Sequence, residues 1–446
     1  MLCSRKSLVE FYSSRILRFA RRITPESEFA EYCKSINVNV FTAEITKQQS
    51  WDFLHNNFSF QESLDSSLIS FFSESGPFNG KKHKRIKRKY LDLCFGVYNC
   101  TLEILEKNKE INRIFVPNGR MADQRTFLIA SKQQNPSIKT VFFEKGFRKD
   151  FYFVGEQSLL DRIAMQTEIR HSDYSPFLSA AATFFELRRI DEGINEYIAG
   201  WEGDSVVEDG DLNGQRVTFF NSSNDEFMSL GTEWNDSDWE SQWEAFEQVA
   251  RYFLKSGSSL TLRMHPNGTN KSRRERSRER VALDAFKEKF PSIKVYKPQD
   301  KINSYKLIRE SDLIVVWNST IGLESSYMGK PVISLNASEW DLSVTNFRVR
   351  NSDDLNRLIE KMPKVDTEAA LKFIAGRISL DKPLYYNHFR NLFLNAKEND
   401  IFFRLAKIVA GSRKLKYRNL FKVFFSSSAS PSYRFLKRIS SMIKGW

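Results

Sequence analysis

Cysteine is scarce in this sequence, with four residues among 446 and no CxxC pair. This scarcity argues against a disulfide framework and against a zinc site, and it makes a reducing cytosol the expected compartment. Long apolar runs are also missing, because no stretch approaches the roughly 20 residues that cross a bilayer. Arginines interrupt the first apolar residues, LVEFYSSRILRFARRI, so residues 1–25 predict a basic amphipathic helix and not a signal peptide.

Acidic residues are absent from the segment 401–446, which holds eleven Lys or Arg. The formal net charge is +13, so the rest of the chain is nearly neutral, which argues against a nucleic-acid-binding protein. The basic tail also contains Phe, Leu and Ile, a composition typical of segments that bind an anionic membrane surface. We therefore expect a cytoplasmic protein, peripheral on the inner face of the cell membrane. The alternative is a tail that packs on the protein body.

The composition is globular, with 41% hydrophobic and 28% charged residues, and the length suggests two domains with appendages. Strand-like and helix-like segments alternate from INRIFVPNGR at 111 and again from RVTFF at 216. Such alternation implies an α/β fold with mostly parallel sheets, here two Rossmann-like domains facing a cleft, with basic amphipathic helical termini. The predicted domains are 1–205, 206–385, and a crossover helix with the basic tail over 386–446. The acidic segment 196–215 would link the first two.

Polar turns follow four of the predicted strands. In an open parallel sheet, ligands bind beyond the carboxyl ends of the strands, so these turns are the candidate site. They lie at 144–146, 221–224, 263–266 and 318–320.

The turn in DLIVVWNSTIGLESSYMGKP suggests an anion site. Ser319 or Thr320 is suited to cap the following helix, whose free N–H groups and dipole attract a phosphate. Gly322 would let that phosphate approach the backbone. Glu324, one turn along, would accept from sugar or ribose hydroxyls. The alternative is an ordinary capped helix with a surface Glu.

His265 stands between the apolar strand LTLRM and Pro266, which fixes the turn. With Arg263 two residues earlier, its imidazole would neutralise charge on a departing phosphate. The alternative is a structural histidine.

Glu144 closes the predicted strand SIKTVFFE, and Gly146 would let the chain turn sharply after it. A carboxylate at this position is a candidate general base for an acceptor hydroxyl. The alternative is a turn residue paired with Lys145 or Arg148. We expect the other acidic turn, 236–238, to cap the Trp-rich helix that follows it.

The order and spacing of these motifs resemble the capsule polysaccharide biosynthesis family of GT-B glycosyltransferases, which is related to bacterial Kdo- and sialyltransferases. The resemblance covers residues 215–336 well and 110–165 loosely. It rests on Ser222, Ser223, Glu226, Arg263, His265, Pro266, Tyr305, Asp312, Ser319, Thr320, Glu324, Gly329, Lys330 and Pro331.

This resemblance implies a metal-independent transferase, without a cofactor, that uses a nucleotide sugar and a polysaccharide or lipid-linked acceptor. Glu144 would be the general base, although Lys145 replaces the family's second acid. His265 would stabilise the leaving phosphate. The implied donor-binding residues are Arg263, Pro266, Ser319, Thr320, Glu324, Ser222, Ser223 and Tyr305.

Four alternatives remain open at this stage. A teichoic-acid-type glycerophosphotransferase typically has Asp-Tyr-Ser-Ser where this chain has WNST at 317–320. A nucleotide-sugar 2-epimerase needs first-domain acid–base residues that the sequence does not reveal. A catalytically silent membrane-associated scaffold and a nucleic-acid binder are the others. The basic run KKHKRIKRK at 81–89 is interpreted as a solvated helix face that is also suited to an anionic acceptor or lipid headgroups.

Overall fold

The computed structural model describes residues 57–146, 151–189, 214–344, 347–360 and 365–383, together with two short paired strands, β1 (Leu2–Cys3) and β2 (Asn39–Val40). The predicted helix at 1–25, the linker up to 213, the crossover after 383 and the basic tail lie outside these residues. Two compact units divide the chain, one of Met1–Ala182 with Glu202–Lys382 and one of Thr183–Trp201 with Pro383–Trp446. Both large sheets fall in the first unit, so the predicted domain boundaries stay predictions.

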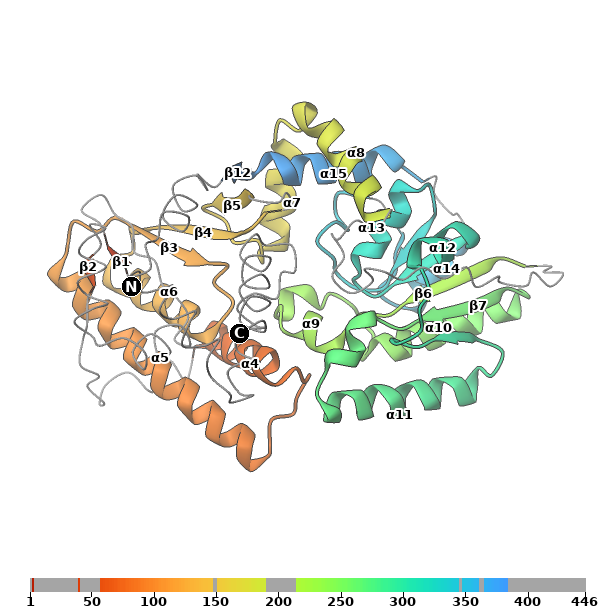
Figure 1. The fold of residues 1–446 in the computed structure, drawn as a ribbon, viewed down its shortest axis with the longest axis horizontal. Helices are drawn as coiled ribbons and strands as arrows, with labels where there is room; N and C mark the ends of the chain where they lie inside the picture. Colours follow the sequence, from red (N-terminus) through yellow and green to blue (C-terminus); the bar gives the residue numbers. More distant parts are fainter. Residues whose placement is uncertain are drawn as a thin grey trace, which may run out of the picture. The chain divides into compact units, whose positions relative to one another are not determined.

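The first large sheet has four strands in the order β12-β5-β4-β3 (Figure 1). Strands β3 and β4 pair in parallel, whereas β4 and β5 form an antiparallel hairpin. The sequence analysis missed β5 because it assumed that a helix follows each strand. The strands are β3 (Arg113–Pro117), β4 (Lys139–Lys145), β5 (Phe151–Gly155) and β12 (Asp381–Pro383).

Helices α4 and α5 pack on α6, so the chain from residue 57 onward is part of the body of this first half. Apolar residues of α5, β3 and α6 share one buried cluster, and residues of α4, α5 and α6 share another. The helices of this half are α4 (Phe58–Phe72), α5 (Lys81–Lys107), α6 (Ala122–Gln134), α7 (Arg162–His171), η1 (Ser175–Phe177) and α8 (Leu178–Arg189).

The second large sheet has six parallel strands in the order β11-β10-β9-β6-β7-β8. Numbered along the chain, this is the doubly wound order, in which the direction of winding reverses between the first and fourth strands, here β6 and β9. The predicted α/β fold of GT-B type, with two Rossmann-like halves, is confirmed. The strands are β6 (Arg216–Phe220), β7 (Ser259–Arg263), β8 (Lys294–Tyr296), β9 (Leu313–Val316), β10 (Val332–Ser334) and β11 (Phe347–Arg348).

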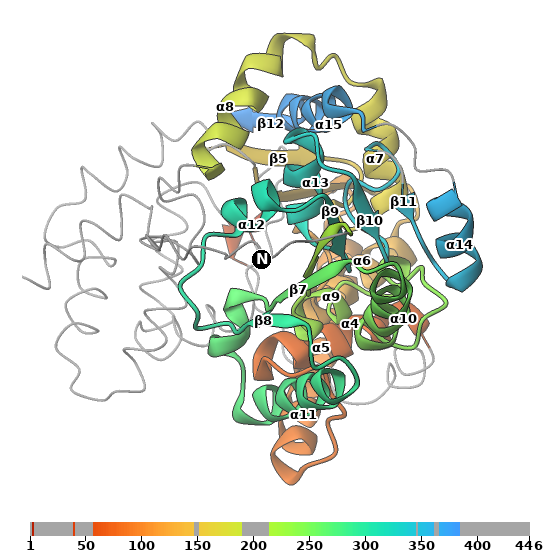
Figure 2. The same ribbon diagram turned by 90° about the vertical axis from the view of Figure 1, so that its right-hand side faces the viewer.

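The main core of the second half packs α10, α11 and α14 against the sheet, while α12 and α13 contact β6, β9 and β10 from the other side (Figure 2). The strand β9 is buried at every position, as its apolar run predicts. The helices are α9 (Asn224–Met228), η2 (Thr232–Trp234), α10 (Gln242–Lys255), η3 (Pro266–Asn270), α11 (Arg273–Lys289), α12 (Ser304–Glu310), α13 (Thr320–Tyr327), α14 (Ser352–Glu360) and α15 (Thr367–Ser379).

The chain returns to the first half through α15 and β12. Helix α15 contacts α13 as well as α7 and η1, and β12 then joins the first sheet beside β5. The return therefore begins before residue 386, where the sequence analysis placed the crossover helix. None of the helices in the described part of the chain combines the length and the apolarity needed to cross a membrane.

Candidate functional site

The turns after β6 and β9 meet at the point where the winding of the second sheet reverses. The Asn318 backbone N–H donates to Ser222 Oγ at 3.4 Å, which joins the two turns directly. Because β6, β7 and β9 are parallel, the turn that carries His265 leaves from the same edge. Ligands of open α/β sheets bind at such an edge, next to the switch in strand order. The structure therefore brings three of the four predicted turns together.

The turn after β9 has the capped helix start that the sequence predicts. Ser319 is the N-cap of α13, and its Oγ accepts from the Ile321 N–H at 3.3 Å. Thr320 is the first helical residue and is exposed. The first N–H groups of a helix lack backbone partners, and together with the helix dipole they favour an anion.

Gly322 has a different role from the one predicted. It is buried, and a Cβ added there would lie 2.4 Å from the Trp340 ring and 3.1 Å from a Val316 methyl group. The glycine therefore makes room for Trp340 inside the domain, and the idea that it lets a phosphate reach the backbone is wrong. Sequence alone did not show this contact, because Trp340 lies in a later loop.

We expect Gly322→Ala to destabilise the protein by about 1–3 kcal/mol, because overpacking of a closed core forces neighbouring groups to move. Urea unfolding would measure the change. Gly257→Ala is unsuitable as a control because Gly257 has a φ of +76°, so Ser325→Ala, in the same helix, is the better comparison. An unchanged midpoint for Gly322→Ala would contradict the packing role.

His265 is held in one orientation at the end of β7. Its backbone N–H donates to Asn221 Oδ1, and its Nδ1 accepts from the Asn267 N–H at 3.2 Å. A neutral imidazole whose Nδ1 accepts must carry its proton on Nε2. Pro266 begins the 3-10 turn η3 directly after it, as the sequence predicts. The side chain thus carries an N–H donor on Nε2.

A chain of polar contacts links His265 to α9. Asn267 Nδ2 donates to Glu226 Oε1, and Lys271 Nζ donates to the same oxygen at 3.2 Å and to Asp225 Oδ2 at 3.0 Å. Burial lowers the pKa of His265 below its ordinary value of 6.5; the Glu226 carboxylate opposes this shift and Lys271 adds to it. The imidazole is therefore neutral at pH 7, in the form that donates through Nε2.

Asn221, which the sequence analysis did not assign, marks the same place. This residue is 2% exposed, and its Nδ2 has no hydrogen-bond partner in the described part of the chain. A buried amide without a partner is costly, so such a group indicates that a ligand or water atom completes it. Its position at the carboxyl end of the central strand β6 is the sequence signal that was available.

Several predicted donor residues are buried and bonded to the protein itself. Arg263 is 1% exposed and donates to the Lys297 carbonyl at 2.5 Å, which fixes the loop after β8; burial lowers its pKa to about 10. Tyr305 donates its hydroxyl to Glu324, and both are at most 3% exposed. Arg263, Tyr305 and Glu324 therefore stabilise the turns through contacts inside the protein. The ribose contact proposed for Glu324 stays a prediction.

The two predicted serines are also buried. Ser222 Oγ accepts from the turn after β9, and Ser223 Oγ donates to Asp225 at 2.9 Å. Ser223 is 1% exposed and is the N-cap residue of α9. Both serines therefore join the turns at the switch point through contacts within the protein.

Glu144 lies near the end of β4, which continues to Lys145 and turns into β5, so Glu144 does not close its strand as predicted. Gly146 has an ordinary φ, and a Cβ there would lie 2.6 Å from the Asp381 carboxylate. It therefore makes room for β12. The predicted turn is present, because the Gly146 N–H donates to the Phe151 carbonyl at 2.9 Å and β5 then runs antiparallel to β4, but it does not require an unusual φ at Gly146.

Arg120, in the NGR turn after β3, is the partner of Glu144 that the sequence analysis missed. Burial lowers the pKa of Arg120, and the Glu144 carboxylate opposes that shift. Its Nη1 donates to the Ser229 carbonyl at 3.3 Å, and Ser229 ends α9. Helix α9 is five residues, or roughly 8 Å, long, and its Glu226 receives the Asn267 contact described above. Arg120 beside Glu144 and Asn267 beside His265 thus both contact this one short helix and its C-cap.

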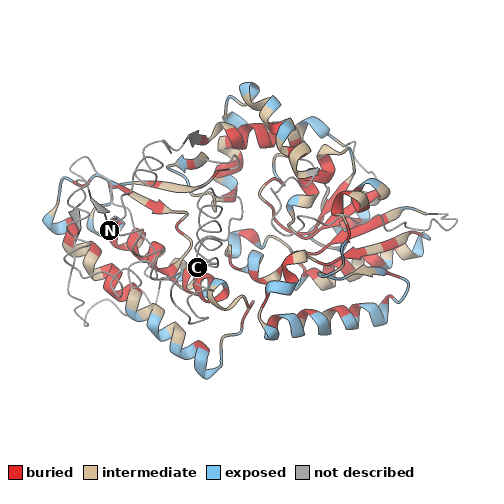
Figure 3. Cartoon of the chain, in the orientation of Figure 1, coloured by how far each residue is buried: buried red, intermediate tan, exposed pale blue. Residues whose placement is uncertain are grey.

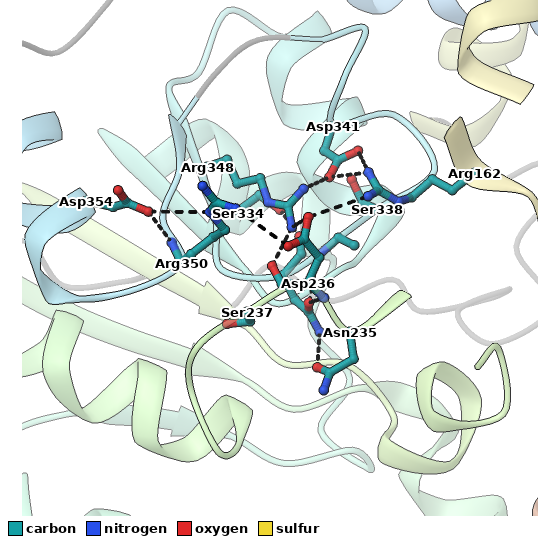
Figure 4. A network of polar contacts seen from close by, with 12 residues as sticks. Arg162, Asn235, Asp236, Ser237, Ser334, Ser338, Asp341, Arg348, Arg350 and Asp354 are labelled. Atoms are coloured by element: carbon teal, nitrogen blue, oxygen red, sulfur yellow. Dashed lines mark hydrogen bonds and ion pairs between the residues drawn. The ribbon is translucent and has the colours of Figure 1, made fainter. Parts of the chain in front are cut away.

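A third group of polar contacts joins the two halves (Figure 4). Arg162 at the start of α7 donates through Nη1 to both oxygens of Asp341, at 2.7 and 2.9 Å. Arg348 also reaches Asp341, at 2.6 Å, and Asp236, at 2.7 Å. The expectation that the acidic turn at 236–238 caps the Trp-rich helix is wrong, because Ser241 is the N-cap of α10 and Asp236 pairs with Arg348.

The described residues contain no group of three or more His, Cys, Asp or Glu that could hold a metal ion. The hydrogen-bond donors at this site are Asn221, His265 and the first turn of α13.

Part of the chain is similar to a known protein family. Residues 234–345 match the family described as "Capsule polysaccharide biosynthesis protein". The matched segment includes the His265 turn, the start of α13 and Glu324. The resemblance that the motifs indicate is therefore confirmed over this part of the chain. No curated protein matches the sequence.

Solved structures show weaker likenesses. The Thermosulfurimonas dismutans KpsC beta Kdo 2,7 transferase has 14% identity and a TM-score of 0.38 over 67% of this chain and 90% of its own. The beta Kdo 2,4 transferase of the same protein has 13% identity and a TM-score of 0.37 over 62% and 85%. The UDP-GlcNAc 2-epimerase from Neisseria meningitidis, bound to UDP-GlcNAc, has 12% identity and a TM-score of 0.24 over 69% and 82%. Because these scores are below 0.5, the site assignment depends on the geometry and not on them.

Proposed function

We propose that this protein is a glycosyltransferase that moves a sugar from a nucleotide-activated donor to a growing cell-surface polysaccharide or to its lipid-linked precursor. One observation carries the proposal. Three polar turns, with a neutral histidine, an unpartnered buried amide and a capped helix start, lie at the switch point of a doubly wound sheet. The match of residues 234–345 to capsule polysaccharide biosynthesis proteins supports the same function.

In the proposed reaction, the acceptor hydroxyl loses its proton to the Glu144 carboxylate and attacks the anomeric carbon of the donor sugar. The bond between that carbon and the phosphate oxygen breaks, and the phosphate leaves with both electrons. His265 Nε2–H and Asn221 Nδ2–H would donate to the leaving phosphate, with Ser319, Thr320 and the first N–H groups of α13 around it. Preformed donors of this kind stabilise developing charge without a metal ion, so the proposal includes none.

His265→Asn is the sharpest test of the donor site. Asn is a good N-cap residue whose oxygen still accepts from the Asn267 N–H, but it lacks the Nε2 donor. A hydrogen bond to a charged group contributes roughly 1.5–3 kcal/mol, so we expect at least tenfold weaker binding of the cognate nucleotide. Thermal shift against CMP, UDP, GDP and CDP would measure it, since a hundredfold excess over the dissociation constant stabilises by roughly 2.7 kcal/mol.

His171→Asn is the matched control, because His171 is exposed at the end of α7. This variant should respond to the nucleotide as the wild type does. If no nucleotide shifts the melting temperature of folded wild-type protein, the transferase proposal fails and a catalytically silent scaffold becomes the better description.

We also propose that the protein is peripheral on the inner face of the membrane through its basic tail. Each Lys or Arg near an anionic surface adds on the order of 1 kcal/mol, and residues 401–446 contain eleven. Removal of residues 412–446 should therefore abolish sedimentation with anionic vesicles. Equal sedimentation of the truncated and full chains would end this idea.

A further inference from the structure

Two helices begin with an unusual excess of exposed basic side chains. We call these segments the basic ends: residues 81–89 at the start of α5 and 273–280 at the start of α11. Together they contain ten exposed Lys or Arg side chains. Their only acidic residues, Glu275 and Glu279, are 1% and 8% exposed. The exposed charges of both segments are therefore all positive, and Figure 3 shows the exposed outer sides of the two helices.

The basic ends belong to one continuous surface. Ser75, in the loop that leads into α5, donates its N–H and its hydroxyl to the Glu275 carboxylate at 3.0 and 2.7 Å. The Ser272 N–H, directly before α11, donates to the Ser73 carbonyl at 3.4 Å. In the same loop, Glu74 lies 3.5 Å from His83 of α5. These contacts hold the first turns of α5 and α11 against one short loop, so their charges act together.

Helix stability does not account for this charge. The N-terminal end of a helix carries a partial positive charge, so each cation in the first turn opposes helix formation by a few tenths of a kcal/mol. Helix α5 has no acidic residue in its first turn, and the only one in α11 is the buried Glu275. Packing does not explain the charge either, because the side chains are exposed. An external anion would compensate these cations.

The basic ends lie on the same side as the candidate site. Helix α11 follows the His265 turn at once, and Arg276 Nη1 donates to the Thr269 carbonyl of η3 at 3.2 Å. In the first half, Arg120 Nη1 donates to Ser70 Oγ in the last turn of α4 at 3.1 Å, and α4 leads into the loop that precedes α5. The cationic surface thus extends outward from the residues assigned to catalysis.

We propose that the basic ends bind a polyanionic glycan, the acceptor chain, through its carboxylate or phosphate groups. This inference rests on the proposed function and specifies its acceptor. A chain that bears a charge on each repeat would meet successive Lys and Arg side chains while its end reaches Glu144. A membrane surface fits less well, because interfacial segments also present exposed Trp, Phe or Leu. In the two described segments no large apolar side chain is exposed; Val281 lies just beyond them.

The test uses the full chain and a quadruple variant, Lys84→Gln, Arg85→Gln, Arg273→Gln and Arg274→Gln, at exposed positions. The matched control neutralises four exposed lysines at the opposite ends of the same helices and adjacent to them, Lys107, Lys109, Lys287 and Lys289, and changes the net charge equally. Fluorescence anisotropy would measure binding of a labelled oligogalacturonate at low salt. A neutral maltooligosaccharide of the same length is the ligand control.

We expect on the order of tenfold weaker oligogalacturonate binding for the quadruple variant, and little change for the control variant. Wild-type affinity should fall as salt is raised, and the neutral oligosaccharide should not compete. The melting temperature of the quadruple variant should stay equal or rise, because cations are removed from helix N-termini. Loss of affinity without loss of stability is a result that a merely structural role would not produce.

Equal binding by both variants would overturn the inference. So would a quadruple variant that loses binding to phosphatidylglycerol vesicles but keeps oligogalacturonate, because the basic ends would then be a membrane surface. The nucleotide thermal shift separates the two proposals. A normal shift with no oligogalacturonate binding overturns only the acceptor assignment, whereas no nucleotide shift at all overturns the transferase itself.

Discussion

Asp341→Ala should lower the free energy of unfolding by about 3–5 kcal/mol, which is the usual cost of removing one partner from a buried ion pair. The Asp341 side chain is 1% exposed and that of Arg162 is 5% exposed. The carboxylate accepts from Arg162 through both oxygens, from Arg348 at 2.6 Å and from Gln166 Nε2 at 3.0 Å. Without it, the buried Arg162 guanidinium keeps a single carboxylate neighbour among the described residues, Asp236 at 3.6 Å. Urea unfolding at neutral pH would measure the loss.

Asp312→Ala is the contrasting variant. Asp312 pairs with Arg216, but the two side chains are 41% and 40% exposed, so the pair contributes below about 1 kcal/mol. A double-mutant cycle that combines Asp341→Ala with Arg162→Met would measure the interaction energy of the Arg162–Asp341 pair separately from the contacts between Asp341 and Arg348. A loss for Asp341→Ala no larger than that for Asp312→Ala would show that the network in Figure 4 contributes little to stability.

Glu279→Gln should stabilise the protein above neutral pH. Burial above all, together with the nearby carboxylates of Glu275, Asp225 and Glu226, raises the pKa of Glu279 from 4.5 to about 7, although Lys271 opposes the shift. The folded protein therefore holds a proton that the unfolded chain releases. The contribution of Glu279 to stability is greatest below pH 4.5 and declines as the pH rises to about 7, by roughly 3 kcal/mol. A neutral amide avoids this loss, so the free energy of unfolding of the variant at pH 8 should exceed that of the wild type by roughly 3 kcal/mol.

Urea unfolding at pH 5 and pH 8 would check this expectation, because the gain should be much smaller at the lower pH. Glu288→Gln is the matched control, since Glu288 is exposed on the same helix and its replacement should leave the pH dependence as it is. A Glu279→Gln variant that is no more stable than the wild type at pH 8 would mean that this carboxyl group is ionised without cost.

The features that the sequence predicted correctly depend on neighbours along the chain. An apolar run followed by Asn, Ser and Thr was sufficient to predict strand β9, the Ser319 cap and helix α13. The features that were missed depend on distant partners. The packing role of Gly322 depends on the ring of Trp340, and the role of Asp236 depends on its ion pair with Arg348. Local patterns carry no information about which remote side chain fills the adjacent space, so the turns of the site were predictable and their supporting contacts were not.

The return of the chain to its first half has a consequence for biosynthesis. The first sheet includes β12, which is synthesised more than 200 residues after its neighbour β5, and α15 must also exist before it can cover α7. At roughly 5–20 residues per second, a ribosome needs on the order of 10–50 s to make the intervening chain. Through that interval the edge of β5 is unpaired while the second half emerges and folds. The first half is therefore begun first and completed last, and a nascent chain stalled before residue 381 would expose that edge to other chains.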